Sequence, residues 1–457
     1  MKKAYRIFCA MLFLTLLLSA LAACSKREDA PDPNENTSSV NGGTGTSDTG
    51  DSGNTGPEIL YDENGYELDD LPEELDFGNV DFRILTWSEW GKQDFMLEEG
   101  ITWNEELYAR QLTIEEQLGV VIKVSQERGS WDYRASFLQT VENDLNANTT
   151  SSYDLILSYG ASVGGITTRG YAANLHNFTY LNFNKPWWSD DQIEASSING
   201  KLYFLSADAP TTTVQTICCI FGNENLLTSY GYTDLYDVVY EGEWTLERMM
   251  ETALGNVNFG DGGSNIYAMT IAASMQAPFL TAAGYKYLGH DENGLICVAE
   301  DLNDLRVHNL FATLQDFVCN HEDVQINVPR TTFEGGSAFF HASQLSDMVP
   351  FVNSTNFDFI ILPLPKYDTD QQNYQTLCGS WNAYYCIPYR VQNEDMSGAV
   401  LEALGSQGYR MVTPVVFEEC LSLQFVSDPE DSAMVQFIYG TLTYDAAHVF
   451  ASDAVGN

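Results

Sequence analysis

The sequence predicts an α/β protein with two lobes. Strand-like and helix-like segments alternate along residues 81–160, a pattern typical of βαβ units around a parallel sheet. The body that begins near residue 58 is long enough for two domains, since a domain usually has about 100–200 residues. Hydrophobic residues make up 44% of the chain and aromatic residues 12%, so each lobe can bury a core.

The first lobe is expected to open with three strands separated by helices. The strands are predicted at 81–87 (DFRILTW), 120–126 (VVIKVSQ) and 153–160 (YDLILSYG). An amphipathic helix is predicted over 103–119 and a second helix through 136–147. In such a βαβαβ succession, ligand-binding loops follow the carboxyl ends of the strands.

The pattern changes after GKLYFLSADAP at 200–210, where a second group of elements begins. Helices are predicted from Glu224, over 244–255 with Thr245 as the cap, across 301–320, and through the tail from Ser397, which contains a loop at 425–431. Strands are predicted at 213–221 (TVQTICCIF), 335–343, 357–365 and 380–388.

The N-terminal segment resembles an export signal. Residues 1–23 combine an early positive charge, an apolar run too short for a bilayer span and small residues before Cys24. Leu-Ala-Ala-Cys also resembles a bacterial lipobox, which predicts acylation of Cys24 and a membrane anchor; an ordinary secretory signal is the alternative. Residues 25–57 are rich in Gly, Ser, Thr, Asn and Asp and are expected to form a disordered tether, which gives a signal peptide at 1–23 and a tether at 24–57.

Charge and cysteine usage narrow the class of protein. The formal net charge of −43 repels phosphate backbones, so nucleic acid is excluded as a partner. The cysteines beyond Cys24 are odd in number and contain no Cys-x-x-Cys pair, which favours buried thiols and leaves one disulfide open. The histidines form no spaced cluster, so we expect no metal site.

The order of segments resembles the family 1 extracellular solute-binding proteins of bacterial ABC importers, the sugar-binding type. YDLILSYG is similar to a strand of that family, INGKLYFLSADA (198–209) to the segment that leads into its hinge, and GNENLLTSYGYTDLYDVVYEGEWTLERM to its block of paired helices. GGSAFFHAS, FDFIILPLPKYD and SWNAYYCIP resemble three further strands in the same order. The resemblance covers about residues 81–440. It departs at Gly222-Asn223-Glu224, and relatives continue beyond the position of Asn457, so part of the second lobe is expected to be missing.

The resemblance implies a periplasmic-binding-protein-like fold of type II, with two α/β lobes joined by a multi-strand hinge. The first lobe would comprise 58–209 and about 357–403, and the second 210–356 and about 404–457. The implied function is a lipid-anchored receptor on the extracellular face of the membrane. It would capture an oligosaccharide by closing the hinge and deliver it to ABC permease subunits, with no cofactor and no catalysis.

Candidate ligand contacts follow from the chemistry of sugars, which offer apolar C–H faces and many hydroxyls. Flat aromatic rings and Asp, Glu, Asn or Gln side chains suit both features. The first-lobe candidates, at strand ends and at the hinge, are Trp87, Glu89, Trp90, Tyr159, Gly160 and Asp208. Trp381, Asn382 and Tyr384 lie in the strand after the hinge, where relatives place a stacking aromatic residue. The second-lobe candidates are Gln276, Phe279, His341 and Gln344.

Other functions remain open at this point. The many carboxylates do not exclude a glycosidase, because sequence spacing cannot show the separation of a catalytic pair. No P-loop or His-Glu-x-x-His motif is present, and a surface adhesin would show repeats. A peptide or another solute, such as a uronate, on the same scaffold is the closest alternative.

Overall fold

The computed structural model describes most of the chain beyond the predicted tether. The described residues are 59–91, 94–95, 104–147, 149–206, 208–254, 266–379, 381–416 and 429–450. The predicted signal peptide 1–23, the acylation site Cys24 and the tether 25–57 lie outside them. Within the described part, no helix is both long enough and apolar enough to cross a bilayer.

The chain divides into a small unit over 1–68 and a large unit over 69–457. In the described part of the small unit, the backbones of Tyr61 and Glu67 pair in an antiparallel bridge. All helices and strands named below belong to the large unit.

The first sheet has the strand order β12-β3-β1-β2. Its members are β1 (Val80–Trp87), β2 (Val120–Glu127), β3 (Leu155–Tyr159) and β12 (Ala383–Cys386). β1 pairs in parallel with β2 and β3, whereas β12 runs antiparallel to β3. The four predicted strands of this region are confirmed, and the carboxyl ends of β1, β2 and β3 share one edge of the sheet.

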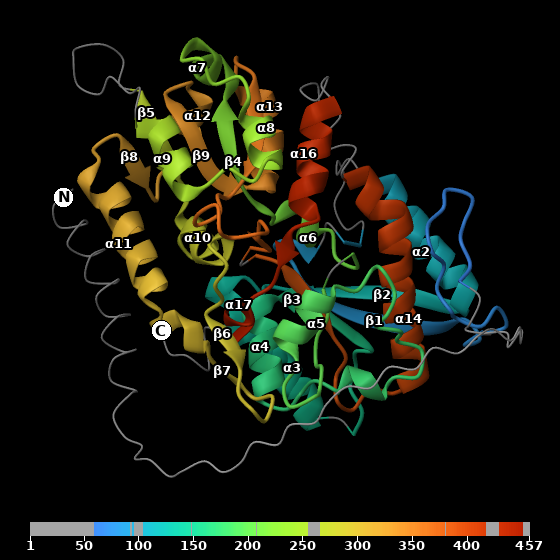
Figure 1. Cartoon of the computed structure of the whole chain (residues 1–457). Helices are drawn as coiled ribbons and strands as arrows, with labels where there is room; N and C mark the ends of the chain where they lie inside the picture. Colours follow the sequence, from blue (N-terminus) through green and yellow to red (C-terminus); the bar gives the residue numbers. More distant parts are fainter. Residues whose placement is uncertain are drawn as a thin grey trace, which may run out of the picture. The chain divides into compact units, whose positions relative to one another are not determined.

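Several helices and helical turns belong to the same part of the structure as this sheet. They are α2 (Asn104–Leu118), η2 (Trp131–Tyr133), α3 (Arg134–Ala147), α4 (Gly160–Thr168), η3 (Leu175–Asn177), α5 (Asp190–Ser196), α14 (Glu394–Gln407) and α17 (Ala447–Phe450). Figure 1 shows α2 and α14 side by side, in agreement with their contacts. The apolar side chains of β1 and β3 form one hydrophobic core with those of α3, α4 and α14.

The second sheet has the strand order β10-β4-β9-β5-β8. Its members are β4 (Cys218–Asn223), β5 (Tyr267–Ile271), β8 (Val324–Ile326), β9 (Ala338–Gln344) and β10 (Phe359–Pro363). β9 is buried along its whole length and pairs with β4 on one side and β5 on the other. A second hydrophobic core surrounds this sheet, so each of the two sheets has its own core.

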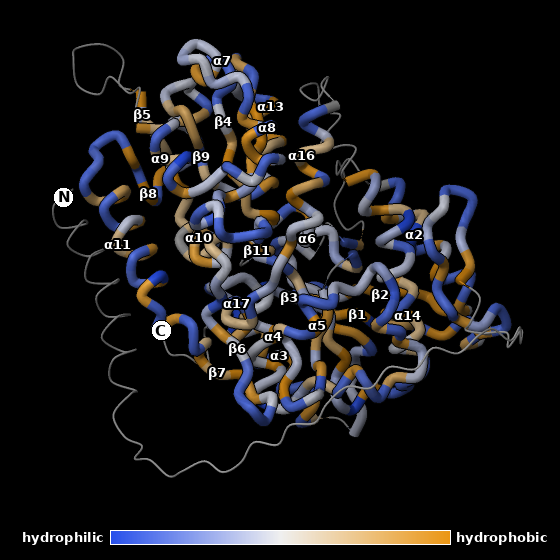
Figure 2. Tube along the Cα trace, viewed as in Figure 1, coloured by the Kyte–Doolittle hydropathy of each residue, from blue (hydrophilic) through white to orange (hydrophobic). Residues whose placement is uncertain are grey.

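Most of the helices around the second sheet are short, and α11 (Leu305–Asn320) is the longest. They are α7 (Glu224–Ser229), α8 (Leu235–Tyr240), α9 (Leu246–Leu254), η4 (Ala273–Met275), α10 (Gln276–Ala282), η5 (Glu300–Asn303), α11 (Leu305–Asn320), α12 (Thr331–Glu334), η6 (Leu345–Asp347), α13 (Met348–Ser354) and α16 (Pro429–Tyr439). The predicted cap is confirmed, because the Arg248 N–H donates to Thr245 Oγ1 at 3.2 Å. Figure 2 shows α11 as a mixture of hydrophilic and hydrophobic residues, and its Val307, Leu310 and Phe317 are buried.

Three local predictions differ from the structure. The strand expected over 213–221 begins only at Cys218, because a helical turn, α6 (Thr212–Gln215), precedes it. The Thr216 hydroxyl donates to Thr212 O at 2.8 Å, a local side-chain bond that favours the turn over the strand. The hairpin of β6 (Leu288–His290) and β7 (Ile296–Val298) was not predicted. The helix expected from Ser397 begins earlier, as α14, and continues into a π-helical turn at Gly408–Val412.

Three segments of the chain pair where it passes between the two sheets. β11 (Thr376–Leu377) pairs in parallel with β13 (Leu442–Thr443), and Ile217 forms an antiparallel bridge with Cys378. The N–H groups of Cys378 and Gly379 donate to Thr443 O at 3.1 Å and to Thr216 O at 3.0 Å. This arrangement is the multi-strand hinge of the predicted two-lobed α/β fold.

Two segments pair or pack with a different sheet from the one that the proposed lobe boundaries imply. β10 pairs with β4 in the second sheet, although it lies inside the 357–403 segment proposed for the first lobe. Ala446, Val449 and Phe450 join the core of the first sheet, although they lie in the segment proposed for the second lobe. The boundaries at 209, 357 and 403 remain a proposal.

Candidate binding site

Four aromatic side chains from three separate segments form a continuous cluster. Trp87 at the end of β1 stacks on Tyr159 at the end of β3, with ring centroids 5.7 Å apart and an interplanar angle of 26°. The Tyr159 ring lies 5.7 Å from that of Trp381, which lies 6.4 Å from that of Trp90. We call these four residues the aromatic cluster. The structure thus brings together four residues that the sequence nominated separately.

Strand topology explains why these rings meet. Because β1 and β3 are parallel neighbours, their carboxyl ends place Trp87 and Tyr159 at the same edge. β12 is antiparallel to β3 and pairs Ala383 with Tyr159, so Trp381 arrives at this edge two residues earlier. The site therefore lies where open α/β sheets usually bind ligands.

Exposure divides the cluster into inner and outer rings. Trp87 and Tyr159 are 0% and 5% exposed, whereas Trp90 and Trp381 are only partly buried. Burial raises the pKa of Tyr159 to about 12, so its hydroxyl stays protonated at neutral pH. Trp87 Nε1 is buried without a hydrogen-bond partner among the described residues. The inner rings support Trp381, which packs against Trp90, and these outer two rings have exposed surface.

Glu89 binds the neighbouring loop. Its carboxylate accepts hydrogen bonds from Gly129 N at 2.9 Å and Ser130 Oγ at 3.0 Å, and Arg128 Nε lies 3.8 Å away. Burial alone would raise the pKa of Glu89, but these hydrogen bonds hold it below its ordinary value. Glu89 is therefore ionised and positions the loop after β2.

That loop supplies residues that the sequence analysis missed. The Arg134 guanidinium lies 3.9 Å from the ring centroid of Trp131, and that of Arg128 lies 3.2 Å from the centroid of Tyr133. Trp131 is 38% exposed. The available signal was the position of RGSWDYR directly after the second predicted strand, whose carboxyl end lies at the same edge. The exposed Trp131 ring, which packs against the Arg134 guanidinium, is a further candidate ligand contact.

Gly160 and Tyr384 have packing contacts below the cluster. Gly160 begins α4, and a Cβ at this position would lie 3.1 Å from Tyr384 Cε2. The Tyr384 ring is 4% exposed and packs edge-to-face on Phe204, with centroids 5.4 Å apart. Glycine at 160 therefore allows β12 to approach β3 closely.

Asn382 is 1% exposed and belongs to a buried polar group at the hinge. Its Nδ2 donates to Ser206 Oγ at 2.7 Å, and its Oδ1 accepts from the hydroxyls of Thr212 and Thr213 at 3.3 and 3.4 Å. These bonds connect the segment before β12 to the segment that leaves the first lobe.

Asp208 also lies at the hinge. Its carboxylate accepts a hydrogen bond of 2.7 Å from the hydroxyl of Tyr439, the last residue of α16. Burial raises the pKa of Asp208 to about 6, against the opposing effect of hydrogen bonds from Tyr439 and Thr413. The contact ties the first crossing segment to a helix on the second core.

The second-lobe candidates have different surroundings. Phe279 is 6% exposed in the second core, and His341 is fully buried, with Nδ1 2.8 Å from Thr270 Oγ1. Gln276 begins α10, but its side chain lies outside the described residues. Gln344 ends β9, and its buried Nε2 has no partner among the described residues. Gln344 lies beside the hinge, because a Cβ at Gly379 would fall 2.2 Å from Gln344 Nε2.

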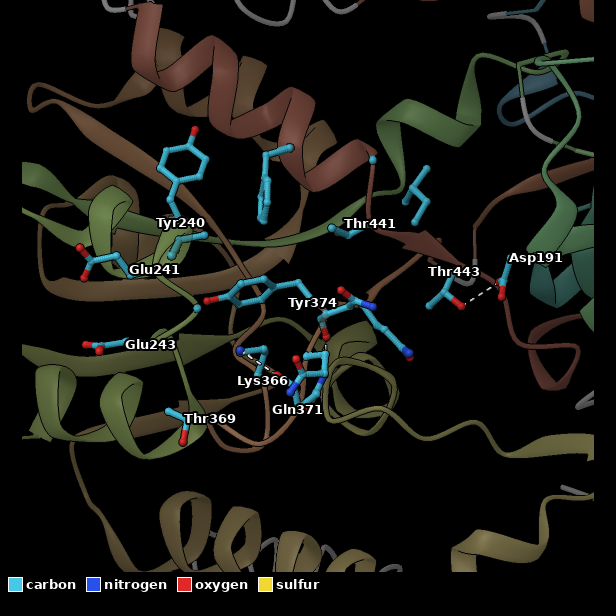
Figure 3. A pocket seen from close by; sticks show the side chains of 18 residues that line it. Asp191, Tyr240, Glu241, Glu243, Lys366, Thr369, Gln371, Tyr374, Thr441 and Thr443 are labelled. Atoms are coloured by element: carbon cyan, nitrogen blue, oxygen red, sulfur yellow. Dashed lines mark hydrogen bonds between the residues drawn. The ribbon is translucent and has the colours of Figure 1, made fainter. Parts of the chain in front are cut away.

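A separate pocket of about 740 Å³ lies elsewhere in the large unit (Figure 3). It is lined by the end of α8 and the turn after it, by the segment after β10, and by the end of α16 with β13. The lining includes Tyr240, Lys366, Tyr374 and Thr443 and no member of the aromatic cluster. This pocket was not predicted from the sequence. No group of metal-ligating side chains occurs among the described residues.

Comparison with known proteins identifies the fold. No protein-family profile matches the sequence. No curated protein matches it either. Solved structures do match, among them a sugar transporter from Rhizobium etli in an open conformation, with 14% identity, a TM-score of 0.55, and coverage of 80% of this chain and 89% of that chain.

Two further solved structures are similar over the same extent. One is the galacto-N-biose-/lacto-N-biose I-binding protein of an ABC transporter from Bifidobacterium longum in complex with lacto-N-biose, with 13% identity, a TM-score of 0.52, and coverage of 81% and 88%. The other is UgpB from Mycobacterium tuberculosis in complex with glycerophosphocholine, with 16% identity, a TM-score of 0.51, and coverage of 82% and 89%. At this identity the likeness shows the fold: two α/β lobes of the periplasmic-binding-protein-like type.

Proposed function

We propose that this protein is the extracellular substrate-binding protein of an ABC importer and that it captures an oligosaccharide by closing its hinge. The fold and the similarity to sugar-binding transporter proteins support this function. Binding and release require no bond to be made or broken, so the proposal assigns no catalytic residue. The partner that would receive the solute is the permease of the transporter.

The aromatic cluster is the observation that carries the choice of ligand. Trp90 and Trp381 are partly exposed neighbouring rings, and Trp381 packs on Tyr159, which stacks on Trp87. Rigid, flat rings offer a large apolar area at low entropic cost and match the C–H face of a pyranose. Because the hinge connects two separate cores, contacts made only in the closed state would stabilise closure.

Another small solute is the second candidate. The similar protein from Mycobacterium tuberculosis was solved with glycerophosphocholine, so the scaffold alone does not determine ligand chemistry. Arg134 over Trp131 is the local feature that favours a charged or phosphate-bearing ligand. A peptide is the third option. A glycan-cleaving enzyme has the least support, because the site as described is built from aromatic rings.

The decisive experiment is calorimetry of the soluble chain lacking residues 1–24 against a panel of neutral oligosaccharides. We expect binding by the parent chain and a loss of affinity of about ten-fold or more for Trp381→Ala, which corresponds to about 1.4 kcal/mol. Tyr389→Ala is the matched control, because Tyr389 is 43% exposed and follows the opposite end of β12. Cleavage of a glycan, or binding of peptides and no glycan, would refute the function.

We also propose that the protein is held at the membrane by lipid on Cys24. The support is the lipobox-like sequence before Cys24 and the polar tether after it. In a bacterial host, radiolabelled palmitate should enter the parent chain and not Cys24→Ala, which should be released from the membrane fraction. A Cys24→Ala variant that stays in the membrane fraction would refute the anchor and leave the binding function standing.

A further inference from the structure

The pocket of about 740 Å³ has a buried lysine in its lining. Lys366 is 3% exposed, and its backbone is fixed: its N–H donates to Trp244 O at 3.1 Å, and its carbonyl accepts from Leu246 N at 2.7 Å. Its Nζ donates to the carbonyl of Gln371 at 2.8 Å. Among the described residues, no carboxylate lies within 4 Å of Nζ, although the chain has 64 acidic residues.

A buried ammonium without a counter-charge is unfavourable, because burial removes its hydration. Desolvation lowers the pKa of Lys366 and outweighs the opposing effect of the Asp368 carboxylate, which pairs with Arg306 at 2.6 Å. An ammonium has three donors, and one hydrogen bond to a neutral carbonyl leaves the others available. An anion beside Lys366 Nζ would therefore balance its charge and accept its remaining hydrogen bonds.

Aromatic rings stand beside this charge. Lys366 Nζ lies 5.3 Å from the ring centroid of Tyr374, and Figure 3 shows both side chains together in the middle of the pocket. The Tyr374 hydroxyl accepts from Trp244 N at 3.2 Å, so its own proton can be donated to a ligand. Phe437 packs edge-to-face on Tyr374 and on Tyr240, with centroids 5.7 and 5.5 Å apart.

The acidic residues of the pocket do not neutralise Lys366. Glu241 and Glu243 are exposed, and in Figure 3 their carboxylates point away from Lys366 and Tyr374. The carboxylate of Asp191 accepts from Lys286 Nζ and from the Thr443 hydroxyl, each at 2.8 Å. These partners leave Lys366 as the buried charge that a ligand can meet.

We propose that this pocket is a second binding site, separate from the aromatic cluster, and that its ligand is a sugar acid of one or two rings. The carboxylate of the sugar pairs with Lys366 and accepts from the Tyr374 hydroxyl. The Tyr240, Tyr374 and Phe437 rings and the polar side chains that line the pocket contact the sugar ring. The volume lies in the range of small-molecule sites, about 300–1,000 Å³.

The test is calorimetry of the full chain with glucuronate, with glucose and inorganic phosphate as separate probes. We expect glucuronate to bind, glucose to bind at least ten-fold more weakly, and Lys366→Met to reduce glucuronate affinity at least ten-fold. Lys201→Met, a change at an exposed lysine outside the pocket, should leave the affinity unchanged. Equal affinity for glucose, no binding of glucuronate, or full affinity in Lys366→Met would overturn the proposal. Tighter binding of phosphate than of glucuronate would overturn the assignment to sugar acids.

Two further variants keep the test independent of folding and of the proposed function. Glu241→Gln with Glu243→Gln removes exposed negative charge at the pocket and should raise glucuronate affinity about two- to five-fold at low salt. Trp381→Ala should leave glucuronate binding intact, because Trp381 does not line this pocket. Loss of glucuronate binding in Trp381→Ala would mean that the ligand occupies the aromatic cluster and would reject the second site.

Discussion

Glu402 is a buried carboxyl group that should be mainly protonated in the folded state at neutral pH. Its side chain lies in α14, is 1% exposed, and accepts a hydrogen bond of 3.0 Å from Trp188 Nε1. Burial raises its pKa from 4.5 to about 8, despite the hydrogen bonds that favour ionisation. The folded state therefore binds this proton more tightly than the unfolded state does.

The pH dependence follows from that difference. The stabilising effect of the bound proton is complete below about pH 4.5 and is lost as the pH rises toward 8. Glu402→Gln keeps an acceptor for Trp188 and does not ionise. We expect nearly equal unfolding free energies at and below about pH 4.5 and a variant more stable by about 3 kcal/mol at pH 7, measured by urea denaturation.

Asp395→Asn provides the control, because Asp395 is an exposed carboxylate on the same helix. Its unfolding free energy at pH 7 should differ from that of the parent chain by less than about 0.5 kcal/mol. If Glu402→Gln showed no gain at pH 7, the carboxylate would be ionised and accommodated in the folded state, contrary to the raised pKa.

At the scale of single elements, two glycines of α4 allow neighbouring segments to pack closely against this helix. Gly160 lets Tyr384 approach, and Gly164 lies against α17, where a Cβ would fall 2.0 Å from the carbonyl oxygen of Val449. The partner atom belongs to the backbone, so α17 would have to move to accommodate a side chain. Contacts between α4 and α17 are numerous, so the displacement would affect the whole pair.

Gly164→Ala should lower the unfolding free energy by about 2 kcal/mol, measured by thermal or urea denaturation. Gly289→Ala is the matched control in β6, because a Cβ there would lie 3.6 Å from Ala299 Cα, an ordinary contact. That control should change stability by less than about 0.5 kcal/mol. Equal effects of the two substitutions would show that α17 does not hold α4 in this position.

The elements that sequence periodicity could predict are those with a regular apolar pattern. β1, β2, β3, β9 and β10 are continuous or alternating apolar runs, and the structure has strands at each. The turn of α6 was missed because threonine hydroxyls bond locally, an effect that a β-branched run conceals. The hairpin of β6 and β7 was missed because each strand has three residues, too few to show a period.

The aromatic cluster could be predicted because strand order places Trp87 and Tyr159 at one edge. To predict that Trp381 joins them, one must also know the antiparallel register of β12, which brings Trp381 to the same edge. The pocket around Lys366 could not be predicted. Tyr240, Tyr374 and Phe437 come from three distant segments, and no spacing in the sequence relates them.

At the scale of the whole molecule, the first core depends on residues near the end of the described chain. Phe450 is 4% exposed and packs edge-to-face on Phe204, with ring centroids 5.9 Å apart. The two residues are separated by the entire second sheet in sequence. A substitution at 450 should therefore destabilise the lobe that begins the body of the protein.

Phe450→Ala should reduce the unfolding free energy by about 3–5 kcal/mol, as expected for loss of a buried aromatic side chain. Intrinsic tryptophan fluorescence measures it directly, because Trp87, Trp187 and Trp188 are buried in the first core. Leu305→Ala, at a position 74% exposed, should have an effect below about 0.5 kcal/mol. A small effect at 450 would show that the first lobe is complete without its last helix.

The alkylation rates of two buried cysteines can be used to measure how often their surroundings open. Cys378 lies in the hinge and Cys386 in the first sheet; both are free and buried, and burial raises the pKa of each thiol to about 12. Alkylating reagents attack the thiolate, so neither thiol should react until its surroundings open. The labelling rate at Cys378 would report local opening between the crossing segments, while that at Cys386 would report loss of the sheet. The ratio of the two rates would separate hinge motion from unfolding without the introduction of a new cysteine.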